Sequence, residues 1–132
     1  MPLVYLDSSA LVKLVVAEPE SMALIEHLEE WPQRVSSALA LTELPRALDR
    51  AGLGAAAHRR AREVLGRIAL VDVDRRILTT AATLQPSTLR TLDAIHLATA
   101  LAVREDLEMV VTYDRRLRAA AERVQIDVVA PA

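Results

Sequence analysis

The chain has 132 residues, no cysteine and a formal net charge of −2, and 52% of its residues are hydrophobic. This length favours a single domain, residues 1–132, with a sizeable core. The lack of cysteine excludes a disulfide scaffold and thiolate metal sites and fits a cytoplasmic protein without an export signal. No uncharged apolar stretch reaches the length of a membrane span, and the slight acidity argues against a broadly basic nucleic-acid-binding surface.

Short apolar runs alternate with helical patterns along the chain. Strands are expected at residues 3–6, 34–37, 68–73, 109–112 and 126–129. Helices are expected near residues 9–17, 20–31, 38–51, 54–67, 75–84, 91–105 and 115–123. Alternation of this kind predicts a three-layer α/β/α fold, in which helices cover both faces of a central parallel sheet of about five strands.

Asp7 stands at the joint between the first predicted strand and the following helix, in the segment LVYLDSSALVKL. Asp114 follows the strand 109–112 by two residues. Both acids therefore lie at carboxyl ends of strands, where parallel sheets bind their ligands. Each is also a good N-cap for the helix behind it, worth about 1 kcal/mol. Taken singly, either acid has a purely structural interpretation.

Glu43 and Asp93 lie in predicted helices whose neighbouring residues are mostly apolar, in SSALALTELPRAL and LRTLDAIHLATALAV. An apolar setting predicts at least partial burial, and a buried carboxylate is costly unless it is paired or binds a metal. The structural alternatives are a favourable helix dipole for Asp93 and an exposed helix position for Glu43.

If these four acids converge, each pair repels by about 4 kcal/mol at about 4 Å in a partly buried setting. A divalent cation relieves that repulsion, and oxygen ligands suit Mg²⁺ or Mn²⁺ better than zinc. Thr112 and Ser8 place hydroxyl groups close to Asp114 and Asp7 in the sequence. These two hydroxyls are therefore candidates to hold ligands or waters in the site.

Four segments, taken in order, resemble the acidic motifs of PIN-domain ribonucleases: VYLDSSALVKL, the glutamate in ALTEL, LDAIHLATAL and VVTYDRRL. The overall resemblance is to VapC-type toxins of bacterial toxin–antitoxin pairs, and it covers nearly the whole chain. It implies a PIN-like fold and an endoribonuclease that hydrolyses RNA with Mg²⁺ or Mn²⁺ and a metal-activated water.

The resemblance also assigns a role to each acid. It implies that Asp7 and Asp93 are the most direct metal ligands, that Asp114 acts through water and that Glu43 orients water or a second ion. Thr112 is implied to fix the pocket. The partners implied are an RNA substrate, a second copy of the chain in a homodimer, and a cognate antitoxin that covers a groove and blocks the acidic site.

Arginines near the acids are candidates for contacts with RNA phosphates. Arg90 precedes Asp93 by three residues, and Arg115 and Arg116 follow Asp114 directly. Arginine suits bidentate phosphate contacts, although solvated helix positions are an equal alternative. Aromatic residues make up only 2% of the chain, so a base-stacking platform is not expected.

Two further residues bear on the site. Pro45 lies two residues after Glu43 and cannot donate a hydrogen bond to the carbonyl of Leu41, so a kink or local break is expected there. His96 lies three residues after Asp93. Because no second histidine has ligand spacing, we expect His96 to pack under the site or to be partly exposed, while a metal or general-base role stays open.

Two other functional classes fit part of the pattern. A signalling receiver also gathers acids around Mg²⁺, but it needs a lysine after its last strand, and here that strand is followed by APA. A non-catalytic binding protein that kept the fold is the other alternative, and the presence of all four acids counts against it.

Overall fold

The computed structural model describes residues 2–132, and its elements follow the predicted order. The strands are β1 (Leu3–Leu6), β2 (Arg34–Ser37), β3 (Ala69–Val71), β4 (Leu107–Val111) and β5 (Val128–Val129). The helices are α1 (Ser8–Val15), α2 (Ser21–Glu29), α3 (Ala40–Arg50), α4 (Ala55–Leu65), α5 (Arg75–Thr83), α6 (Thr91–Ala102) and α7 (Arg115–Arg123). The strands β3 and β5 are shorter than predicted, and α6 ends three residues early.

The sheet confirms the predicted fold class. Its five strands are all parallel and lie in the order β3-β2-β1-β4-β5. The chain builds outward from β1 to β3 on one side and then from β4 to β5 on the other, so the order reverses between β1 and β4. A reversal of this kind opens a crevice at the carboxyl ends of the two strands. Receivers have the order 2-1-3-4-5 instead, so the receiver alternative is wrong.

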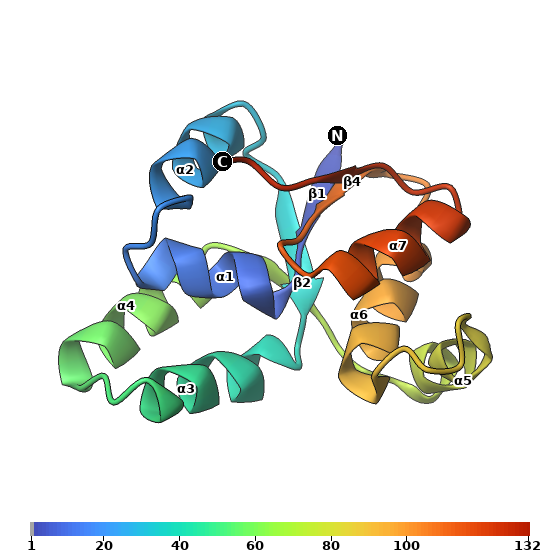
Figure 1. The fold of residues 1–132 in the computed structure, drawn as a ribbon, viewed down its shortest axis with the longest axis horizontal. Helices are drawn as coiled ribbons and strands as arrows, with labels where there is room; N and C mark the ends of the chain where they lie inside the picture. Colours follow the sequence, from blue (N-terminus) through green and yellow to red (C-terminus); the bar gives the residue numbers. More distant parts are fainter. Residues whose placement is uncertain (1) are drawn as a thin grey trace.

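Helices cover both faces of the sheet, as Figure 1 shows, with α1 to α4 on one side and α5 to α7 on the other. Successive side chains of a strand point to opposite faces. Val4 and Leu6 accordingly enter the core with α1, α3 and α4, whereas Tyr5 enters the core with α6 and α7. All three side chains are fully buried. The strand that ends at the candidate site is therefore held from both sides.

Helix α3 continues through Pro45, so of the kink or local break expected there, the break is wrong. Leu44 and Leu48 are buried on the face toward the core and hold the helix in place. The carbonyl that loses its partner belongs to Leu41, which is 58% exposed, and water can satisfy a carbonyl at such a position. Among residues 2–132, the structure contains no helix that combines the length and the apolar character of a membrane span.

Candidate active site

Asp7 begins the site at the carboxyl end of β1. It is the N-cap of α1: its backbone is extended, and its Oδ1 accepts a hydrogen bond from the amide of Ala10 at 3.1 Å. The hydroxyl of Ser9 donates to the same oxygen at 2.7 Å. The capping role proposed from the sequence is thus correct, and it fixes the carboxylate at the carboxyl end of β1, next to β4.

Thr112 connects Asp7 to the segment that follows β4. Its Oγ1 donates to Asp7 Oδ2 at 2.5 Å and accepts from the amide of Asp114 at 3.0 Å. Ser9 makes a second connection, because its Oγ accepts from the amide of Tyr113 at 2.9 Å. The two hydroxyls hold the ends of β1 and β4 in register around the Asp7 carboxylate. The sequence analysis named Ser8 as a candidate to hold ligands or waters and missed Ser9, whose hydroxyl contacts Asp7.

Burial and hydrogen bonding act in opposite directions on Asp7. The side chain is only 2% exposed. Burial raises the pKa of the Asp7 carboxyl, and the hydrogen bonds from Thr112 and Ser9 and the nearby His96 partly offset this rise. A carboxylate in this position gains from any cation that approaches it.

Asp93 and Asp114 form the more open side of the site. Asp114 caps α7, and its Oδ1 accepts from the amides of Arg116 and Leu117 at 2.8 and 3.1 Å. Arg90 lies between the two acids, with its Nε 3.5 Å from Asp93 Oδ2 and its Nη2 3.3 Å from Asp114 Oδ2. Burial and the charge of Asp114 raise the pKa of the Asp93 carboxyl, and Arg90 opposes them. The guanidinium therefore partly neutralises the two carboxylates.

Glu43 reaches the site through His96. Its Oε1 lies 2.6 Å from His96 Nε2, and the hydroxyl of Tyr5 lies 2.7 Å from His96 Nδ1. Burial, followed by the charge of Asp7, raises the pKa of Tyr5 well above its ordinary value, so the hydroxyl keeps its proton. His96 packs under the site as expected, and it also aims Glu43.

The remaining predicted residues lie around this centre. Arg115 and Arg116 are exposed in the first turn of α7. Ser8 and Glu43 line a groove of about 430 Å³ between α1 and α3, together with Val12, Arg46 and Leu92. In Figure 1 the starts of α1 and α7 meet at the end of the sheet toward which the strands run.

The donor chemistry fits a hard divalent cation, whereas the spacing is not that of a finished metal cage. Asp7, Asp93 and Asp114 offer carboxylate oxygens, and the charges of Asp114 and Asp7 add to the effect of burial in raising the pKa of Asp93. Yet within residues 2–132 no three His, Asp or Glu side chains have ligand spacing. Arg90 contacts both Asp93 and Asp114 on this side of the site.

Comparisons with known proteins agree with this architecture. The family model of the PIN domain matches residues 4–123. Ribonuclease VapC46 of Mycobacterium tuberculosis is 50% identical over 131 residues, which cover 99% of each chain. Two solved structures share the fold. A toxin–antitoxin complex from Klebsiella pneumoniae has a TM-score of 0.73 at 24% identity, covering 98% of both chains. VapBC2 of Rickettsia felis, bound to a promoter DNA fragment, has a TM-score of 0.77 at 14% identity, covering 98% of this chain and 99% of that one.

Proposed function

The chain belongs to the PIN-domain family and, within it, to the VapC group, and on this premise we propose that it is a metal-dependent endoribonuclease acting as the toxin of a toxin–antitoxin pair. The observation that carries the proposal is the set of acids at the carboxyl ends of β1 and β4, linked through Thr112 and Arg90. The relative named VapC46 is called a ribonuclease, which supports the same activity.

The proposed cofactor is Mg²⁺ or Mn²⁺, held by Asp7, Asp93 and Asp114, with Glu43 at the edge of the site. Such an ion lowers the pKa of a bound water and stabilises charge on the scissile phosphate. The protein positions the acids for this purpose. Thr112 fixes the rotation of the Asp7 carboxylate, and His96 fixes that of Glu43, which leaves Glu43 Oε2 available to orient a water.

Arg90, Arg115 and Arg116 supply the positive charge for RNA in this proposal. All three are exposed at the rim formed by the starts of α6 and α7. Arg90 exchanges its acidic partners for a phosphate when the cation binds, since phosphate is also a bidentate partner for a guanidinium. A slightly acidic chain can therefore bind a polyanion at one edge.

The proposed partners are a cognate antitoxin and a second copy of the chain. The solved relatives include a toxin–antitoxin complex, which supports the first of these. The groove between α1 and α3 opens beside Glu43, so an antitoxin segment lying there would cover the site. A cytoplasmic location is part of the proposal, because the protein would meet its RNA substrate there.

The test is RNA cleavage by the purified protein as a function of metal. Cleavage is expected with Mg²⁺ or Mn²⁺, is expected to stop with EDTA, and should fall about 100-fold or more in Asp93→Asn. Asp106→Asn is the matched control, because Asp106 is exposed before β4, at the opposite end of the strand. Mapping the new 5′ ends in total RNA identifies the target. Metal binding without cleavage would favour a non-catalytic binding protein instead.

A further inference from the structure

A cleft of about 410 Å³ lies beside the acidic site, between α7 and the segment before α6. It is lined by Pro86, Thr88, Leu89, Arg116, Ala119 and Arg123. The cleft begins at the site itself, because the amide of Arg116 donates to Asp114 Oδ1 at 2.8 Å. On the opposite wall Leu89 is followed by Arg90, which contacts the same carboxylate.

The two arginines of this cleft have no carboxylate partner. No Asp or Glu lines the cleft, and within residues 2–132 neither Arg116 nor Arg123 forms an ion pair. They are seven residues apart, so both lie on one face of α7, about 10 Å from each other along the helix. Two exposed guanidinium groups in a row next to a hydrolytic site form a track for an anionic chain.

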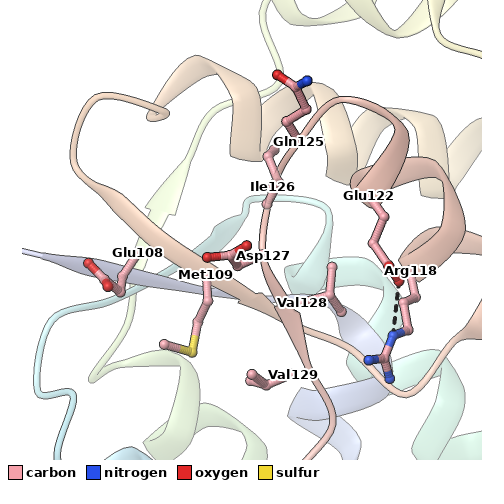
Figure 2. A pocket seen from close by; sticks show the side chains of 9 residues that line it. All are labelled: Glu108, Met109, Arg118, Glu122, Gln125, Ile126, Asp127, Val128 and Val129. Atoms are coloured by element: carbon pink, nitrogen blue, oxygen red, sulfur yellow. Dashed lines mark hydrogen bonds and ion pairs between the residues drawn. The ribbon is translucent and has the colours of Figure 1, made fainter.

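A second pocket, on the other side of α7, differs from this cleft in its charge. It is larger, about 600 Å³, and Figure 2 shows its lining around β5. Its arginine, Arg118, has its Nε 3.1 Å from Glu122 Oε1, the contact drawn as a dashed line. Glu108 and Asp127 add further negative charge. The smaller cleft is therefore the one whose charge is available for an anion.

We propose that the cleft of Arg116 and Arg123 binds the phosphates of the RNA strand on one side of the cleavage position. This inference rests on the proposed function and extends it by assigning the path of the substrate. Arginine forms bidentate hydrogen bonds with phosphate. The cleft contains no aromatic side chain on which a base could stack, so it contacts the backbone and tolerates any base.

The test measures binding apart from cleavage. A fluorescently labelled single-stranded RNA of mixed sequence is titrated with the full chain in EDTA, so that metal-dependent cleavage is absent. The double variant Arg116→Glu/Arg123→Glu should lose roughly tenfold or more in affinity. The slope of log affinity against log salt should become shallower by about 1.4, because two phosphate contacts to a single strand are removed.

The matched control is Arg59→Glu/Arg62→Glu, which makes the same charge change at exposed positions of α4, in the helical layer on the other face of the sheet. It should keep both the affinity and the salt slope nearly unchanged. Circular dichroism checks the fold of both variants. If Arg116→Glu/Arg123→Glu fails to fold, the neutral variant Arg116→Gln/Arg123→Gln is measured in its place. That neutral pair should show a smaller loss in the same direction.

Equal losses in the cleft variant and the control would overturn the proposal, since net charge alone would then explain binding. Tighter binding of a polyglutamate peptide than of RNA at the cleft would also overturn it, in favour of an acidic protein partner. Failure of the proposed ribonuclease function would look different from failure of the cleft proposal. In that case the wild type would bind RNA through the cleft and leave it uncut with either metal. Reduced cleavage in the variant, restored at low salt, would support the assigned path.

Discussion

The two sides of the acidic site differ in how firmly the fold holds them. Asp7 is 2% exposed and accepts hydrogen bonds from Thr112, Ser9 and a backbone amide. The side chains of Asp93 and Asp114 are 17% and 23% exposed, and they share Arg90 through contacts of 3.5 and 3.3 Å. The fold therefore holds both oxygens of Asp7, whereas Asp114 keeps one oxygen on the cap of α7 and shares the other with Arg90, which also contacts Asp93.

The cation proposed above would meet one carboxylate with hydrogen bonds on both oxygens and two carboxylates that contact Arg90. Asp7 keeps the ends of β1 and β4 together, so its hydrogen bonds serve stability as well as function. Burial, followed by the charge of Asp114, raises the pKa of Asp93, and Arg90 opposes this rise. Four measurements test this division, from the largest expected effect to the smallest.

Replacing Asp7 by Asn should have the largest effect on activity. The amide cannot ligate a cation as a charged oxygen does, so cleavage and calorimetric Mn²⁺ affinity should both fall about 100-fold or more. The fold should persist, because Asn caps a helix about as well as Asp. Asp74→Asn is the control, since Asp74 caps α5 in the same way. Full activity in Asp7→Asn would end the assignment.

Replacing Thr112 by Val should remove the hydrogen bonds that join Asp7 to the segment after β4, and so lower the stability. The change keeps the side-chain shape but leaves the amide of Asp114 and one oxygen of Asp7 without their partner. We expect a loss of about 1–3 kcal/mol in the free energy of unfolding, measured in urea, together with reduced cleavage. Thr79→Val, at a threonine of α5 whose hydroxyl bonds the carbonyl of Arg75, should leave cleavage unchanged. Similar cleavage in both variants would contradict the bridging role of Thr112.

Replacing Arg90 by Ala should increase the affinity of Asp93 and Asp114 for a cation. Removal of the competing guanidinium should raise Mn²⁺ affinity up to about fivefold, the size expected of exposed ion pairs. Calorimetry measures this without reference to cleavage. Arg118→Ala removes an arginine paired elsewhere on the surface and should leave the affinity unchanged. Weaker metal binding in Arg90→Ala would show that Arg90 supports the site and does not compete with the metal.

Stability in EDTA should depend on pH through the raised carboxyl pKa values. Burial raises the pKa of both Asp7 and Asp93 in the folded state, whereas unfolded aspartates titrate near about 3.9. At pH values between the unfolded-state pKa and the raised folded-state pKa, the folded state binds more protons than the unfolded state. The free energy of unfolding therefore falls as pH rises through this range. The double variant Asp7→Asn/Asp93→Asn should therefore gain Tm relative to the wild type as pH increases. Parallel Tm curves would refute the assigned shifts.

Local sequence patterns were sufficient to predict the strands and helices and to select the four acids as candidate site residues. Alternating apolar runs and helical periods set the strands and helices, and the acids at strand ends placed Asp7 and Asp114 at the same edge. The break expected at Pro45 was wrong, because tertiary burial of Leu44 and Leu48 outweighed the loss of one hydrogen bond. A local rule fails where packing supplies the larger free energy.

By itself, then, the sequence determined the order of elements, the parallel sheet and the acids at its carboxyl edge. Only the tertiary structure decided which side chains those acids meet. Thr112 contacts Asp7 across 105 residues, and His96 contacts Glu43 across 53. The hydroxyl of Ser9 and the guanidinium of Arg90 find their partners in the same way. Periodicity reports the face on which a residue lies, whereas a hydrogen bond depends on where two distant faces come together.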